Sequence, residues 1–348
     1  MDALSVTRHP LYLLTLARLR TAFREPSTIF WSFGFPIILT IALGIAFRSR
    51  PPEPVAVVVE QGEGAPAAQQ ALAAATGVSS RLLPHDEAQR ELNTGKAALL
   101  VVPGSPRTYA FDPQSPESRL ARAVVDDALQ RAEGRQDATP TAEKHVSEQG
   151  SRYVDFVVPG LIGSNVMSAG MWGIGYVIVE TRTRRLLKRM ISTPMRRSHF
   201  LLSFVLMRML FLAVELPVLL VFAWAVFGVA VRGSVLLLAL LVLLGALAFS
   251  GVAMLIASRA RNTETVTGLI NLIQMPMFLL SGVFFSYARF PEAVQPLIRL
   301  LPLTALLDGM RAVMNEGAGV QAVAPQVLLL AGTAVATFVI GLKLFRWS

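Results

Sequence analysis

The chain has 348 residues, a mean hydropathy of +0.53, 53% hydrophobic residues and only 16% charged ones. Soluble domains carry about 25% charged residues, so much of this chain is expected to avoid water. The sequence contains no cysteine, which excludes disulfides, thiol catalysis and cysteine-ligated zinc. The net charge of +9 comes from basic residues that cluster beside apolar segments, and this distribution argues against nucleic acid as a partner.

Residues 1–26 are predicted to form an amphipathic helix that lies at the membrane interface. Apolar side chains share one helical face, namely Tyr12, Leu16, Leu19 and Phe23. Arg18 and its basic neighbours fall away from that face. The stretch lacks a compact apolar core with a small-residue cleavage site, so a cleaved signal peptide is not expected. A disordered basic leader is the alternative interpretation.

Six apolar segments have the length that a membrane-spanning helix needs. The first is predicted within residues 27–47, and the other five lie at about 154–179, 201–227, 235–257, 266–285 and 327–344. The sequence therefore predicts a mainly α-helical, polytopic membrane protein with six transmembrane helices. Five of these helices belong to a transmembrane domain over residues 153–348.

Residues 48–152 have a different character, because charged residues become frequent and the apolar runs shrink to strand length. Strands are predicted at 55–59, 97–102 and 108–111, and helices at 65–75, 86–92 and 116–132. Residues 134–149 are polar and read as a linker. We therefore expect a small α/β domain between the first two spans.

Orientation follows from the loop at residues 180–200, which holds seven basic residues against one acidic residue. Such an excess marks the cytoplasmic side of a membrane. The rule then places both termini in the cytoplasm and the α/β domain outside. We expect a multi-pass protein of a bacterial inner membrane, with lipid as its surroundings.

Residues 286–320, before the last span, carry apolar stretches that prolines and glycines interrupt. The candidate residues of this outer segment are Gly282, Pro291, Pro302 and Arg311. A full crossing needs about twenty uninterrupted apolar residues. The segment is therefore predicted to form two short helices that re-enter the outer leaflet, where protein must bury their backbone.

The loop at 180–200 also has an amphipathic pattern, because basic residues alternate with Leu186, Leu187, Met190 and Ile191 before Pro194. One interpretation is a topology signal that lies on anionic lipid. The other is a docking helix, whose apolar side inserts into a groove of a partner protein while its arginines pair with acids.

A family resemblance favours the docking helix. The loop resembles the coupling region of type-2 ABC exporter permeases, in which a glutamate precedes a basic Arg-Leu helix that ends in Thr-Pro. The matching and neighbouring residues here are Glu180, Arg184, Arg185, Leu187, Lys188, Arg189, Thr193 and Pro194. A second resemblance lies in Leu280-Ser-Gly-Val-Phe-Phe, Phe290-Pro and Leu301-Pro-Leu-Thr-Ala-Leu-Leu-Asp-Gly-Met-Arg, which are similar to the family's signature before its last span. The order of elements is similar as well.

The resemblance implies a permease subunit without its own ATPase. No Gly-x-x-x-x-Gly-Lys-Ser/Thr loop exists, since Gly95-Lys96 runs into Ala97 without an upstream glycine. The chain itself is expected to bind no cofactor. Two copies of a separate ATPase subunit would use ATP and Mg²⁺ and would engage two permease chains, identical or paralogous. The implied cargo is an amphipathic or lipidic molecule moved outward.

Polar residues inside the spans are candidates for the translocation pathway. They are Asn165, Glu215, Asn271 and Gln274. An ionisable group such as Glu215 within a span requires a partner or a water-lined cavity, and Arg208 is expected to extend its charge toward the cytoplasmic surface. For each residue the alternative role is a structural contact between helices.

Other functions have weaker support. A non-transporting receptor or scaffold could use the α/β domain to sense a ligand, although six spans exceed what an anchor needs. A secondary transporter usually shows internal repeats around broken helices, which we do not find. His9, His85, His145 and His199 are scattered, so the sequence predicts no metal site and no membrane enzyme.

Overall fold

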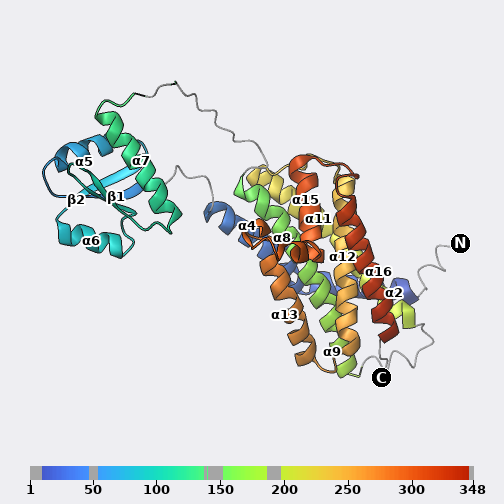
Figure 1. The fold of residues 1–348 in the computed structure, drawn as a ribbon. Coiled ribbons are helices and arrows are strands. Elements are labelled where there is room, and N and C mark those ends of the chain that lie inside the picture. The colour runs from blue at the N-terminus through green and yellow to red at the C-terminus, as the bar shows by residue number, and fades with distance from the viewer. Residues whose placement is uncertain (1–9, 47–53, 137–138, 140–151, 186–196, 345–348) are drawn as a thin grey trace. The chain divides into compact units, whose positions relative to one another are not determined.

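The computed structural model describes residues 10–46, 54–136, 139, 152–185 and 197–344. These residues fall into two compact units (Figure 1). The helical unit comprises Met1–Arg48 with Val146–Ser348, and the α/β unit comprises Ser49–His145. Each unit has its own hydrophobic core.

Among the described residues, five helical stretches are long and apolar enough to cross a membrane, at Pro26–Ala46, Tyr153–Thr183, His199–Phe227, Val235–Arg259 and Ala324–Leu344. They correspond to the predicted first, second, third, fourth and sixth spans. The first consists of α3 (Pro26–Ile29), the π-helical turn η1 (Phe30–Gly34) and α4 (Phe35–Ala46). The second consists of α8 (Tyr153–Gly170), the π-helical turn η2 (Met171–Tyr176) and α9 (Val177–Thr183). The protein is therefore a mainly helical, polytopic membrane protein.

The remaining three of these stretches lie in α11 (Arg197–Phe227), α12 (Val235–Arg259) and α16 (Ala324–Leu344). The predicted fifth segment forms α13 (Thr263–Leu280), which has 18 residues. It is shorter than expected, because the helix ends at Ser281 and the chain turns through Gly282 at a φ of 81°. Its Glu264, Asn271 and Gln274 make it more polar than α11, α12 and α16.

Between α13 and α16 the outer segment forms η3 (Tyr287–Arg289), α14 (Gln295–Arg299) and α15 (Pro302–Glu316). Helix α15 is the longest of the three, with 15 residues, and most of its apolar side chains are buried. It packs against α8, α12 and α16, so this segment is an integral part of the helical core.

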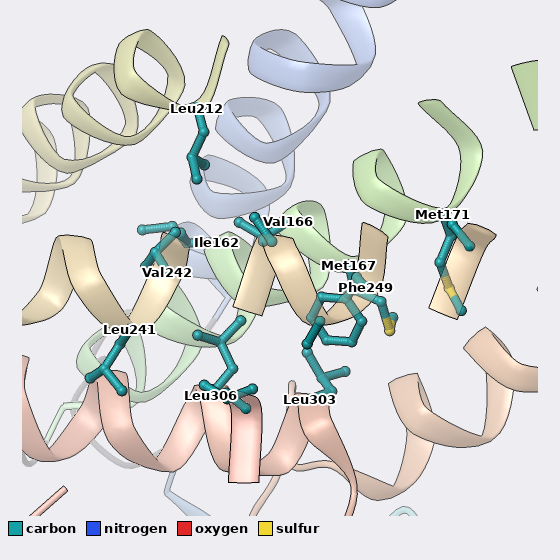
Figure 2. Packing of buried hydrophobic residues seen from close by; sticks show 14 of the residues in the cluster. Ile162, Val166, Met167, Met171, Leu212, Leu241, Val242, Phe249, Leu303 and Leu306 are labelled. Carbon is teal, nitrogen blue, oxygen red and sulfur yellow. The ribbon is translucent and has the colours of Figure 1, made fainter. Parts of the chain in front are cut away.

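Helix α12 lies at the centre of the helical unit and packs against α16, α15 and α8. Figure 2 shows Phe249 of α12 close to Met167 of α8 and Leu303 of α15. Glycines allow the helices to approach closely: a Cβ on Gly251 would lie 2.1 Å from Oγ1 of Thr337 in α16. Small residues at such contacts are typical of helices that pack in membranes.

Helix α2 (Pro10–Arg24) packs against α11. Its Tyr12 and Phe23 are exposed by about two fifths, and the ring centroid of Phe23 lies 5.1 Å from that of Phe211 in α11. Arg18 lies on the side of α2 that packs against α11. Its guanidinium group stacks 3.4 Å from the ring centroid of Phe204, and its Nε donates to Ser203 Oγ at 3.0 Å. A cation–π contact thus holds α2 on α11.

The α/β unit contains one four-stranded sheet with the order β2-β1-β3-β4. Its strands are β1 (Val55–Glu60), β2 (Val78–Leu83), β3 (Leu99–Val102) and β4 (Thr108–Ala110). Strand β1 pairs in parallel with β2 and β3, and β4 runs antiparallel to β3. Helices α5 (Ala65–Ala74) and α7 (Pro116–Ala132) cover one face, whereas α6 (His85–Asn93) covers the other.

Strand β2 was missed by the sequence analysis. It pairs along its whole length with β1 but lies at the edge of the sheet, and its sequence VSSRLL contains no continuous apolar run. By contrast, the central strands alternate buried side chains between both faces, with Val57 and Val59 on one side and Val58 on the other. Strands buried on both faces carry the stronger sequence signal.

Candidate functional site

A buried polar layer joins α11, α8 and η1. It consists of Ser32, Asn165, Arg208 and Glu215. Glu215 is 1% exposed, and its Oε2 lies 2.6 Å from Nη1 of Arg208. Its Oε1 accepts a hydrogen bond of 2.6 Å from Nδ2 of Asn165. The expectation that Arg208 extends toward the surface was wrong, because a buried carboxylate two turns away along α11 offers it a direct partner.

Asn165 makes a second hydrogen bond that follows from the position of a proline. Its Nδ2 also donates to the backbone carbonyl of Ser32 at 3.0 Å. In an α-helix that carbonyl would accept from residue 36, but Pro36 has no N–H. The helix has a π-helical turn at this point, and Asn165 supplies the hydrogen bond that Pro36 cannot donate. The polar layer therefore makes a contact between helices, and the structure leaves a role of Asn165 in the pathway untested.

A second polar contact links α8 to α13. Gln274 Oε1 accepts from Nε1 of Trp172 at 3.0 Å, and Gln274 Nε2 donates to Oγ of Ser168 at 2.8 Å. Gln274 is half-buried, as is Asn271 one turn earlier. Within the described ranges, Asn271 makes no side-chain hydrogen bond, so the structure does not join the four pathway candidates into one group.

The outer segment is attached to the start of α8. Arg311 in α15 donates to the carbonyl oxygens of Gly282 and Phe156, and its guanidinium stacks 3.7 Å from the ring centroid of Phe156. A Cβ on Gly160 would lie 2.4 Å from the carbonyl oxygen of Val283. Two of the four outer-segment candidates, Gly282 and Arg311, are thus brought together.

The other two candidates, Pro291 and Pro302, lie at turns. Pro291 is exposed, and its carbonyl accepts from the N–H of Val294 at 3.0 Å. Pro302 is the first residue of α15, where a missing N–H removes no helical hydrogen bond. Pro291 therefore shapes an exposed turn, whereas Pro302 is buried at the start of α15.

Asn315 is a residue that the sequence analysis missed. Its Nδ2 donates to the backbone carbonyl of Asp155 at 3.0 Å. Asp155 lies four residues before Pro159, which has no N–H to offer that carbonyl. The same logic explains the bond from Asn165 to Ser32. A proline inside a predicted span therefore signals a carbonyl that a neighbouring helix must satisfy.

The basic loop begins where α9 ends. Glu180 and Arg184 form an ion pair of 2.8 Å at the surface of α9, and Arg185 follows with a φ of 56°. Nη1 of Arg182 donates to the carbonyls of Ala257 and Ala260 at 3.1 and 3.0 Å. From the sequence, Arg182 was identified only as part of the basic excess. Leu187, Lys188, Arg189, Thr193 and Pro194 lie outside the described residues.

Arg18 of α2 contacts α11 through a largely buried guanidinium group. Burial lowers the pKa of Arg18 in α2 to about 10, so its guanidinium is still charged at neutral pH when it contacts Phe204.

In the described part of the chain, no group of three or more His, Cys, Asp or Glu side chains could hold a metal ion.

Comparison with known proteins identifies the family. A family model described as ABC-2 family transporter protein matches residues 26–343, which is most of the chain. The chain belongs to the ABC-2 transporter family. An ABC-2 protein is a membrane transport component of an ABC transporter, which agrees with the five apolar helices. The resemblance seen in the loop and in the outer segment is thereby confirmed at the level of the family.

Relatives of this ABC-2 protein include permeases from two bacteria. It is 31% identical over 121 residues to the inner membrane transport permease YhhJ of Escherichia coli, covering 35% of the chain and 32% of that relative. It is 24% identical over 176 residues to the linearmycin resistance permease protein LnrN of Bacillus subtilis, covering 51% and 46%. A third match, to ABC transporter G family member 20 of Dictyostelium discoideum, is 25% identical over 206 residues and covers 58% and 28%. The chain thus spans less than half the length of these relatives.

Proposed function

We propose that this ABC-2 protein is the permease subunit of an ATP-driven exporter. The observation that carries the proposal is the family match over residues 26–343. No phosphate-binding loop occurs in the sequence, so hydrolysis of ATP with Mg²⁺ is assigned to a separate ATPase subunit. Export is favoured over import because one relative is named as a resistance permease.

The ATPase is proposed to dock on residues 180–200. The described start of this loop supports the proposal, because Glu180 and Arg184 pair at the surface and leave their helix face accessible. The side chain of Arg184 is 69% exposed, so it is available to the acidic side chains of a partner. Arg185, Leu187, Lys188, Arg189, Thr193 and Pro194 complete the proposed docking surface, and two ATPase copies would engage two permease chains.

A second permease chain is proposed to contact α13. Only Val266 and Ile270 of this helix are buried within the chain. An apolar stripe on its other side is exposed, formed by Leu272, Met275 and Leu279. With that stripe covered by a partner, α13 would serve as a sixth span in spite of its 18 residues. Asn271 and Gln274 on the same helix, with Asn165 and Glu215, are the proposed polar residues of the pathway.

The proposed topology puts both termini and the loop at 180–200 in the cytoplasm of a bacterial cell and the α/β unit outside. Arg259 and Arg261 at the end of α12 support this side for the inner loops, because basic residues mark the cytoplasm. One relative is named as an inner membrane permease, which supports that membrane. The proposed cargo is an amphipathic or lipidic molecule, since the helices offer apolar surfaces with few charges.

Variants of the loop test the proposal in nanodiscs that contain the chain and its ATPase. Changing Arg185, Leu187 or Pro194 should lower ATP hydrolysis that depends on the permease. Arg289→Gln in η3 of the outer segment is the control, because it removes one positive charge far along the chain from the loop. Unchanged hydrolysis in all three loop variants would contradict the proposal.

A further inference from the structure

Arg182 joins the end of α9 to the end of α12. Its Nη1 donates to the carbonyl oxygens of Ala257 and Ala260, and both of these alanines are fully buried. Ala257 lies in the last turn of α12, and Ala260 is its C-cap residue. Carbonyls at a helix end lack N–H partners within the helix, and a cation there also interacts favourably with the helix dipole.

The carbonyls that Arg182 holds belong to a turn shared by two helices. Ala260 is the C-cap of α12, and Asn262 is the N-cap of α13, where its Oδ1 accepts from the N–H of Thr265 at 2.8 Å. Only Arg261 lies between them. A displacement of this short turn must therefore move the ends of both helices. Arg182 is in direct contact with it from the neighbouring span.

The second span also packs closely against α12 over the residues that precede Arg182. A Cβ on Gly170 would lie 3.1 Å from Cβ of Phe249, and one on Gly175 would lie 3.3 Å from the carbonyl oxygen of Ala253. These glycines bring the two backbones together over the stretch that includes η2. Little space is left for the helices to slide past each other.

We propose that Arg182 transmits displacement of the loop to the turn between α12 and α13. This inference rests on the proposed function, in which an ATPase pulls or pushes the loop at residues 180–200. Arg182 is then a positioning residue of the transport cycle, distinct from the exposed pair of Glu180 and Arg184. The exposed pair faces the ATPase, whereas Arg182 faces the core of the permease.

The first step of the test uses the chain alone in nanodiscs. Because the sequence has no cysteine, Thr183→Cys and Arg259→Cys can carry the only two spin labels. Both positions are exposed. We expect the distances between the two labels to have one narrow distribution in the chain with Arg182 and in Arg182→Lys. In Arg182→Gln we expect this distribution to be broad. Arg261→Gln is the matched control, since it removes a charge from the same turn without touching either carbonyl, and its distribution should stay narrow.

The second step adds the ATPase and moves the label to Val320→Cys. This residue is 64% exposed and lies between α15 and α16. In the unchanged background, ATP should alter the label's spectrum. With Arg182→Gln this alteration should shrink at least about fivefold, the lower end of an ordinary coupling between sites, while ATP hydrolysis continues. Arg182→Lys should restore most of it. Arg182→Met, which keeps the apolar stem, replaces Arg182→Gln should that variant not fold.

The outcomes separate the two proposals. A narrow distribution and a full response to ATP in Arg182→Gln would overturn the inference and leave the proposed function standing. Failure of the unchanged chain to bind any ATPase would remove both. A broad distribution together with a lost response and continued hydrolysis would support both.

Discussion

Asn165 donates from its side chain to the backbone carbonyl of Ser32, which lies 133 residues earlier in the chain. The bond exists because Pro36 cannot supply the N–H that a regular helix would place there. The same amide nitrogen lies 2.6 Å from Glu215. One asparagine therefore connects the π-helical turn of the first span to a buried ion pair in α11.

The pair of Arg208 and Glu215 should respond differently to single and double changes. Leaving either charge buried without its partner is expected to destabilise the helical unit by about 3–5 kcal/mol. Replacing both with apolar residues, as in Arg208→Met with Glu215→Leu, should be nearly neutral because no charge is then left alone. Thermal unfolding in detergent measures this. A double variant as unstable as the single variants would contradict the assigned pairing.

The bond from Asn315 to Asp155 can be tested through the proline that makes it necessary. Asn315→Ala should cost about 1 kcal/mol, because the carbonyl of Asp155 then has no partner. With Pro159→Ala the helix regains an N–H for that carbonyl, so the same change should cost less. A double-mutant cycle on thermal stability measures the difference. Equal costs in both backgrounds would show that the proline is irrelevant to this contact.

The contact between α12 and α16 should not tolerate a side chain at Gly251. A Cβ there would lie 2.1 Å from Oγ1 of Thr337, so Gly251→Ala is expected to destabilise by about 1–3 kcal/mol. Gly332→Ala in α16 is the matched control, because a Cβ there meets no atom within 4 Å. It should be neutral or slightly stabilising, since alanine favours helix more than glycine does. Similar stability of both variants would refute the packing.

The α/β unit should fold without the rest of the chain. Its sheet is covered on both faces by its own helices, so a fragment of residues 49–145 should be monomeric and unfold cooperatively. Leu99→Ala removes a fully buried strand residue and should cost about 2–5 kcal/mol. Leu120→Ala, at a position 59% exposed, should change stability by less than about 0.5 kcal/mol. Urea titration followed by circular dichroism measures both, and a fragment without a cooperative transition would contradict the prediction.

The sequence was informative where one physical signal dominates. Long apolar runs predicted five spans correctly. A run of this kind must form a helix in the membrane, because its backbone polar groups can be satisfied there only by hydrogen bonds within the segment. The break after α13 was not located, since Leu280 and Val283 are equally apolar and only Gly282 marks the turn. Strand β2 was missed because an edge strand needs no apolar run.

Contacts between distant residues were harder to predict. The four pathway candidates were identified as polar residues in spans, yet nothing in the sequence indicates that Asn165 meets Glu215 while Gln274 meets Trp172. Pairing of this kind depends on how the helices pack. The position of Pro159 does indicate that the carbonyl of Asp155, four residues earlier, lacks its helical hydrogen bond. It does not indicate that Asn315 donates to this carbonyl.

The most direct test of the proposed permease role is co-purification with the phosphate-loop ATPase encoded nearest to it. The complex would be assembled in nanodiscs, and ATP hydrolysis would be measured with and without the chain. For a permease subunit we expect a stable complex whose ATP hydrolysis falls when Arg185 or Pro194 is changed. A chain that binds no ATPase, or ATP hydrolysis that is the same with and without the chain, would contradict the permease role.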